Sequence, residues 1–428
     1  METLRYGNKG PMVEYLQLAL TRAGFDPGRI DGIFGKRTLN ALERFQRANG
    51  LVADGIAGRL TWAKLYPYLA GYTIHVVRQG DTLSAIARMH NTTVSAIETA
   101  NPEIEAENLA IGAELVVPLD FPVVPEQVSY SYALTSIVLD GLGARYPFLQ
   151  QGRIGTSVMG KSLYSVAIGQ GRKQVGYNAS HHANEWITTP VLLKFLERYA
   201  AAYVTGGSVG GTPARTLYNT TTLYLVPLVN PDGVDLVTGA LKPGDSYYEQ
   251  ARAFAAFYPA IPFPSGWKAN ISGVDLNLGY PAEWERARSI KFSQGYTRPG
   301  PRDYVGTAPL AEPENRAMAR FTRAHDFRLT LSYHTQGRVI FWKFLDYEPE
   351  GSRQIAEAFS EVSGYLVEET PYSSGFAGYK DWFIQSYNLP GYTIEAGLGE
   401  NPLPISQFPD IYRENEGILT LGMVLAPD

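Results

Sequence analysis

Apolar residues recur at helical spacing in the N-terminal part of the chain. Two segments, 12–23 and 38–48, each carry one apolar face, formed by Val13, Leu16, Leu20 and Ala23 in the first and by Leu39, Leu42 and Phe45 in the second. Steps of three and four residues place such side chains on one side of a helix. Glycine-containing turns at 31–35 and 54–58 interrupt the pattern, because glycine tolerates the positive φ of a tight turn. The pattern predicts three short helices within residues 4–66.

A second pattern follows at residues 72–118. It predicts the order strand, helix, helix, strand, at residues 75–77, 83–90, 93–101 and 115–118. Asp81 or Thr82 is placed to cap the first helix, since short polar side chains accept hydrogen bonds from the first free N–H groups. Pro102 ends the second helix because proline disfavours helical backbone in the residue before it. This segment is therefore expected to form a small βααβ module.

The remainder of the chain alternates strand-like runs with amphipathic helices. A stiff linker is expected at 120–126, which contains Pro122 and Pro125. The clearest strands are expected at 164–168, 174–178, 223–229, 329–333 and 391–394, and helices at 189–203, 312–324 and 353–361. Such alternation indicates an α/β domain with helices packed on a mostly parallel or mixed sheet.

Composition narrows the classes of function. The chain has 428 residues, of which 45% are hydrophobic and 18% charged, with a net charge of −5 and no cysteine. This length predicts two or three domains, and the charge balance gives no electrostatic reason to expect nucleic acid as a partner. No run approaches the ~20 apolar residues that span a bilayer, and residues 1–10 hold no signal-peptide pattern. Without cysteine, any bound metal must be held by His, Asp or Glu.

The histidines point to a metal site. Only six occur, and His182 stands three residues before Glu185, while His334 ends a predicted strand. A single histidine is most often structural, and His181 and His325 are interpreted in that way. Two imidazoles and one carboxylate, however, form the ligand set of a catalytic zinc with its fourth position open. We therefore predict one Zn²⁺ in the α/β domain, held by these three residues.

A further carboxylate, Glu395, ends the apolar run 391–394. Buried glutamate is rare without a partner or a role. Glu395 could be the end of a strand held by a salt bridge. The interpretation preferred here is a general base that takes a proton from an activated water and returns it to the leaving amine.

Three parts of the chain each resemble a known protein family. Residues 1–68 resemble the peptidoglycan-binding type 1 domain through Asp31-Gly32, Phe34-Gly35, Thr38, Ala41 and Phe45-Gln46, and residues 72–118 resemble a LysM domain through Gly80 to Ala87 and Asn101-Pro102. Residues 125–428 resemble the zinc carboxypeptidase family (peptidase family M14). The matching motifs there are His182-x-x-Glu185, His334, Glu395, Asn230 to Gly233, Gly273 to Asn277, Glu312 to Glu314 and Asp381-Trp382. The resemblance implies a central mixed eight-stranded sheet flanked by helices, and hydrolysis of an amide bond.

Departures from the family pattern bear on the substrate. Leu278 follows Asn277 where the family's exopeptidases carry an arginine for the terminal carboxylate, and leucine cannot make that contact. Asn277 itself matches the family's substrate-anchoring asparagine, although a turn-stabilising role stays open. Lys268 stands where the family has its oxyanion-stabilising arginine, but it could equally be a surface lysine. Lys380 matches a specificity-pocket position, where a cation would select a substrate carboxylate.

Tyr372 matches the family's substrate-capping tyrosine approximately, because the segment before Asp381 is one residue longer here. A packing role for Tyr372 is the alternative.

The strings that begin at Trp267 and Ser373 are similar to those of γ-D-glutamyl-L-diamino acid endopeptidases of spore-forming Gram-positive bacteria. We therefore expect a zinc-dependent peptidoglycan hydrolase that cuts the amide between D-glutamate and diaminopimelate or lysine. Its expected partners are the glycan strands and stem peptides of the wall. A monomer is expected, associated with the cell wall outside the cell or in the spore envelope. The alternatives are a carboxypeptidase acting on wall peptides and a non-catalytic wall-binding protein.

Overall fold

The computed structural model describes residues 1–428. The chain forms two compact units, of which the first comprises residues 1–129 and 133–150 and the second residues 130–132 and 151–428.

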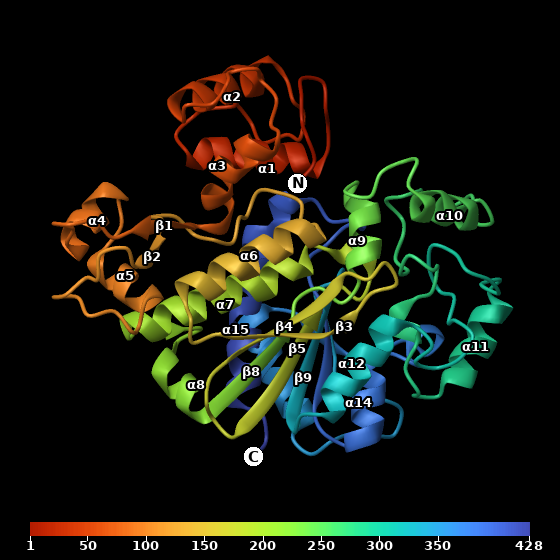
Figure 1. Cartoon of the computed structure of the whole chain (residues 1–428). Coiled ribbons are helices and arrows are strands. Elements are labelled where there is room, and N and C mark those ends of the chain that lie inside the picture. Colours follow the sequence, from red (N-terminus) through yellow and green to blue (C-terminus); the bar gives the residue numbers. More distant parts are fainter. The chain divides into compact units, whose positions relative to one another are not determined.

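The first unit begins with the three expected helices, α1 (Pro11–Arg22), α2 (Lys36–Ala48) and α3 (Arg59–Ala70) (Figure 1). The two glycine turns between them are built alike. Gln17 in α1 donates to the Asp31 carboxylate at 2.9 Å, and Gln46 in α2 donates to the Asp54 carboxylate at 2.9 Å. Both glutamines are buried. A buried amide in each helix therefore fixes the turn that follows it.

The expected βααβ order is present in the next segment. It consists of β1 (Tyr72–Val76), α4 (Leu83–Met89), α5 (Val94–Ala100) and β2 (Glu114–Pro118), and the two strands pair antiparallel. Thr82 is the cap of α4, accepting from the Ala85 N–H at 3.2 Å. Asp81 instead accepts a bond from His75 at 2.8 Å. Helix α6 (Tyr132–Arg145) follows.

The second unit contains the mixed eight-stranded sheet that the family resemblance implies, in the order β11-β10-β12-β9-β5-β8-β4-β3. Its strands are β3 (Gln150–Thr156), β4 (Ser162–Ile168), β5 (Lys173–Ala179), β8 (Thr221–Val226), β9 (Phe327–His334), β10 (Val339–Phe341), β11 (Leu366–Glu368) and β12 (Gly391–Glu395). The central strands β8, β5, β9 and β12 run parallel to one another, whereas β4 pairs antiparallel with β8 and β10 pairs antiparallel with β12. Strand β8 ends three residues before the predicted limit, because Pro227 has no N–H for the ladder.

Helices cover both faces of this sheet. Figure 1 shows α7 (Thr188–Thr205) and α15 (Phe408–Val424) on one side, and α12 (Pro313–Arg323) and α14 (Tyr379–Tyr387) on the other. The remaining helices and the β6–β7 hairpin lie in the connections: α8 (Ala214–Thr220), α9 (Pro231–Thr238), α10 (Ser246–Ala255), α11 (Trp284–Ser293), α13 (Ser352–Ser363), β6 (Ser208–Val209) and β7 (Thr212–Pro213). The parallel centre is thus buried from both sides.

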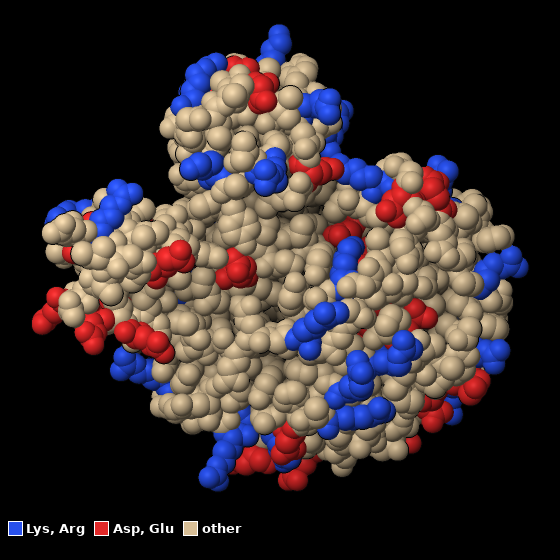
Figure 2. Space-filling view, in the orientation of Figure 1, with Lys and Arg blue, Asp and Glu red and all other residues tan.

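Two further properties concern the surface. No helix in residues 1–428 is long and apolar enough to cross a bilayer. On the face drawn in Figure 2, Lys and Arg side chains gather over the region where Figure 1 places β3 and α12.

Candidate active site

Three neighbouring parallel strands deliver the predicted site residues to one edge of the sheet. The segment with His182 and Glu185 follows β5, His334 is the last residue of β9, and Glu395 is the last residue of β12. Glu395 lies opposite His334 in the register of β12 and β9. Because the carboxyl ends of parallel strands meet at the same edge, residues distant in the sequence come together there.

A tight turn after β5 aims two of these side chains at the edge. Ser180 has a positive φ of 55°, and its buried hydroxyl bonds the hydroxyls of Thr188 at 3.0 Å and Thr189 at 2.9 Å. The chain then makes one 3-10 turn (Ala183–Glu185) before α7 begins. This turn lets side chains three residues apart point to one place.

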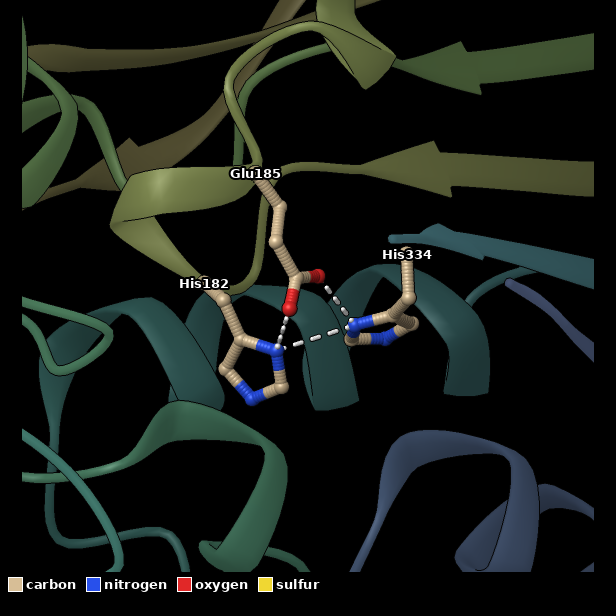
Figure 3. Close-up of side chains that lie close together, drawn as sticks. All are labelled: His182, Glu185 and His334. Carbon is tan, nitrogen blue, oxygen red and sulfur yellow. Dashed lines mark hydrogen bonds and ion pairs between the residues drawn. The ribbon is translucent and has the colours of Figure 1, made fainter. Parts of the chain in front are cut away.

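His182, Glu185 and His334 meet at a single point (Figure 3). The Nδ1 atoms of the two histidines are 3.0 Å apart, and the Glu185 carboxylate lies 3.0 Å from His182 Nδ1 and 2.9 Å from His334 Nδ1. All three side chains are buried. A tetrahedral zinc ion with ligands at about 2.0–2.2 Å separates its ligand atoms by about 3.3–3.6 Å, so a small outward shift of these side chains accommodates it. The spacing and the nitrogen and oxygen donors therefore fit a zinc ion.

Asp275 contacts the ring nitrogen of His182 that points away from Glu185 and His334. Its buried carboxylate accepts a bond from His182 Nε2 at 3.1 Å, and it also caps a short turn by accepting from the Asn277 N–H at 3.1 Å. A proton held on Nε2 leaves the lone pair of Nδ1 free for a metal. Asp275 belongs to the motif Gly273 to Asn277, but no role was predicted for it from the sequence. The signal was a carboxylate in a family motif, and only the fold shows which histidine it contacts.

Electrostatic interactions among these groups are strong. Burial acts against ionisation of Asp275, but the charge and hydrogen bond of His182 outweigh it and hold the pKa of Asp275 far below its ordinary value. Burial likewise lowers the pKa of His334. For His182 burial acts to lower the pKa, but the charges of Glu185 and Asp275, with the Asp275 hydrogen bond, together outweigh it and raise the pKa to about 9. The carboxylates thus make this a site for positive charge.

Glu395 and Lys268 line the same cavity as His182, which has a volume of about 1030 Å³. Burial and the negative charge of Glu185 raise the pKa of Glu395 to about 8. The Lys268 ammonium lies 3.5 Å from Glu185. The backbone carbonyl of Lys268 accepts a hydrogen bond from the Ala183 N–H at 3.0 Å, which fixes the Lys268 segment against the 3-10 turn Ala183–Glu185. A proton acceptor and a cation therefore face the space beside the three-residue group.

Two other family motifs hold these segments in place. Asn230 donates to the carbonyls of His181 at 3.1 Å and Ala269 at 3.0 Å, and so joins the turn after β5 to the Lys268 segment. Asn270 donates to Glu312 at 2.7 Å and to Glu314 at 3.3 Å. These polar residues position the site without lining the ligand group.

The predicted substrate residues lie in different environments. Asn277 and Lys380 line the cavity. The side-chain oxygen Oδ1 of Asn277 accepts from the Tyr379 N–H at 3.0 Å. The Lys380 ammonium donates to Asp381 at 2.6 Å and to the backbone carbonyl of Lys343 at 2.7 Å. Tyr372 is 67% exposed, does not line the cavity, and packs edge-on against Phe376.

Other charged residues in the cavity wall carry no motif. Lys291 and Arg302 both bind Asp303, at 2.7 and 2.6 Å, and all three line the cavity. No periodicity or spacing marks them in the sequence, because they reach the cavity from irregular segments and from one end of α11. His181 lies outside the ligand group and bonds the Tyr280 hydroxyl through Nε2 at 2.9 Å.

A buried group of two histidines and a glutamate at the carboxyl edge of a mixed sheet, beside a separate carboxylate, defines a zinc metallopeptidase site. A model of the zinc carboxypeptidase family matches residues 136–417. Models of a peptidoglycan-binding domain and a LysM domain match residues 9–65 and 75–118.

Similar proteins agree with these matches. The chain is 45% identical over 307 residues to γ-D-glutamyl-L-diamino acid endopeptidase 1 of Lysinibacillus sphaericus, which covers 72% of this chain and 75% of that protein. It is 40% identical over 276 residues to the uncharacterized protein YqgT of Bacillus subtilis (strain 168), covering 64% of this chain and 72% of that protein. The crystal structure of carboxypeptidase A from Helicoverpa armigera shares the fold, with a TM-score of 0.53 and 18% identity over 92% of this chain and 87% of that chain.

The chain therefore belongs to the zinc carboxypeptidase family and carries two N-terminal modules of wall-binding type.

Proposed function

We propose that this protein is a zinc-dependent peptidoglycan hydrolase that cleaves the γ-D-glutamyl-L-diamino acid amide bond of stem peptides. The observation that carries the proposal is the meeting of His182, Glu185 and His334 beside Glu395 and Lys268. The bond is inferred from the name of the relative that is 45% identical. The N-terminal modules tether the enzyme to the wall and so raise the local concentration of its substrate.

His182, Glu185 and His334 are the residues that would hold one zinc ion, which supplies Lewis-acid chemistry by activating a water molecule and polarising the scissile carbonyl. Glu395 accepts the proton of the attacking water. As the new C–O bond forms and the C–N bond breaks, Glu395 passes this proton to the leaving amine. The Lys268 ammonium balances the negative charge that develops on the carbonyl oxygen, acting as a point charge.

The cavity wall also supports recognition of carboxylates along the stem peptide. Lys291 and Arg302 share the carboxylate of Asp303, and both line the cavity, where they add positive charge to its wall. Lys380 uses two of its three ammonium hydrogens on Asp381 and the Lys343 carbonyl, and the third remains for a ligand. Leu278 follows Asn277 and offers no group for a C-terminal carboxylate. These features favour an internal cut over removal of a terminal residue.

Digestion of defined stem peptides tests the proposal directly. Mass spectrometry is expected to show cleavage between D-glutamate and the diamino acid, and a chelator is expected to abolish it until zinc is restored. Release of the C-terminal residue alone would show an exopeptidase acting on wall peptides. No cleavage by a folded protein that contains zinc would point to a binding protein.

A further inference from the structure

A basic groove lies on the second unit, outside the catalytic cavity. It has a volume of about 470 Å³, and four of its lining residues are arginines, Arg153, Arg316, Arg320 and Arg323. No acidic side chain lines it, and no residue lines both this groove and the catalytic cavity. Figure 2 shows basic side chains gathered on this face, over β3 and α12 as labelled in Figure 1. The concentration of positive charge contrasts with the net charge of −5 of the whole chain.

Regular structure sets the spacing of these charges. Arg316, Arg320 and Arg323 stand at i, i+4 and i+7 on α12, so they form one row on a single helical face. The row extends over about 10 Å along the helix axis, at 1.5 Å per residue. Arg153 joins the row from β3, the edge strand of the sheet. The groove thus offers a line of cations and not a single binding point.

A glycine brings the strand and the helix together. A side chain at Gly155 would place its Cβ 2.6 Å from the Cβ of Ala317, which is too close for two non-bonded carbon atoms. Gly155 and Ala317 therefore allow β3 to lie directly against α12. This close contact is what places Arg153 beside the helical row.

The four guanidinium groups have no anionic partner in the protein. None of them forms an ion pair, and all four side chains are exposed. Arg153 donates to the Gly155 carbonyl at 3.1 Å, Arg316 donates to the carbonyls of Leu310 and Ala311, and Arg323 lies 5.5 Å above the Trp382 ring. By contrast, Arg353 and Arg413, which are exposed on other helices of this unit, each pair with a carboxylate. Unpaired like charges held close together repel one another, and an anion relieves that cost.

We propose that this groove binds a phosphodiester-linked polyanion of the cell wall. Arginine pairs with phosphate oxygens in bidentate fashion, and a row of arginines suits a polymer that carries a charge in every repeat. Under the proposed function, stem peptides enter the catalytic cavity, which shares no lining residue with the groove. The N-terminal modules are of wall-binding type, so an anionic polymer of the wall is the polyanion that the groove would meet under the proposed function. The groove would add a second, charge-based attachment to the wall.

Binding of synthetic oligo(glycerol phosphate) to the full-length protein tests this proposal. Titration calorimetry is expected to detect binding that weakens with salt. Arg320→Gln should lower the affinity roughly fivefold, and combined replacement of Arg316, Arg320 and Arg323 by Gln should lower it roughly a hundredfold. The slope of log K against log salt should flatten by about one unit for each phosphate contact that is lost. The matched control is Arg353→Gln with Arg413→Gln, which should bind as the parent does.

Two comparison probes and one activity measurement make the outcomes distinct. Polyglutamate of equal charge and a single-stranded oligonucleotide are titrated alongside; equal affinity for polyglutamate, or stronger binding of the oligonucleotide, would overturn the assignment. Unchanged affinity in Arg320→Gln and in the triple variant would also overturn it. The side chain of Arg320 forms no hydrogen bond or ion pair, and its backbone carbonyl keeps its bond to the Ala324 N–H in the Gln variant, so the single variant covers the case in which the triple variant does not fold. Cleavage of a soluble stem peptide by the variants should equal that of the parent, so failure of the proposed activity is recognised separately.

Discussion

Replacement of Asp275 by Asn is expected to weaken zinc binding while the three ligands stay in place. Asp275 holds His182 through a bond of 3.1 Å between Oδ1 and Nε2. An asparagine of the same shape can keep a neutral bond there, but it removes the negative charge that stabilises positive charge on the imidazole. If its amide NH₂ turned toward His182 instead, the imidazole proton would move to Nδ1, the atom that faces the metal.

The size of the effect follows from the contact distance. Two full charges about 3 Å apart interact by about 5 kcal/mol at an effective dielectric constant of about 20, which is an upper limit because the ligated imidazole carries only part of a charge. The substitution also removes the free-energy cost of burying the charged Asp275 carboxylate, and this gain further reduces the net loss of zinc affinity. Loss of such a supporting group typically costs ten- to a hundredfold in metal affinity, or about 1.4–2.7 kcal/mol. We expect Asp275→Asn to fall in that range.

Competition with a chromophoric chelator measures this affinity without any substrate. Asp303→Asn is a matched control, because Asp303 lines the same cavity but pairs with Lys291 and Arg302 and not with His182. The thermal midpoint of each apoprotein shows whether it is folded. Zinc affinity equal to the parent's in a folded Asp275→Asn protein, or an equal loss in the control, would refute the reasoning.

Three further predictions concern single residues. Glu395→Gln should lower kcat by about 10²–10⁴ while metal analysis still finds the parent's zinc content, and a variant as active as the parent would remove Glu395 from its role. Lys268→Met should lower kcat by about 10²–10³ and Lys268→Arg should restore part of it, whereas equal activity of both would show that no cation is needed there. Burial opposes ionisation of Glu314 and raises its pKa from 4.5 to about 8. The protonated Glu314 side chain therefore contributes fully to stability below about pH 4.5, and this contribution is lost as the pH rises toward 8. Glu314→Gln should therefore lose less thermal stability than the parent between about pH 5 and pH 8, by at most about 1.4 kcal/mol per pH unit, and identical pH profiles would contradict this assignment.

Elements with a regular hydrophobic periodicity, and residues within family motifs, could be predicted from the sequence. The strands that end at His334 and Glu395, the helices α7 and α12, and the ligand triplet could all be proposed from spacing and residue type. Short or irregular elements gave no such signal. Strands β10 and β11 have three residues each and add the far edge of the sheet by pairing with neighbours that are remote in the sequence.

A local pattern determines an element when its period is repeated often enough to mark one buried face. The sequence alone therefore indicated the helices of the two N-terminal modules, α7, α12 and α13, the main strands and the ligand types, whereas α6, α11 and α15 were not predicted. Which groups become neighbours depends on the order of the strands and on close contacts between elements. Only the tertiary structure therefore placed Asp275 behind His182 and set Lys291 and Arg302 around one carboxylate. It also brought Arg153 beside the α12 arginines, since their proximity rests on a glycine that lets the edge strand touch the helix.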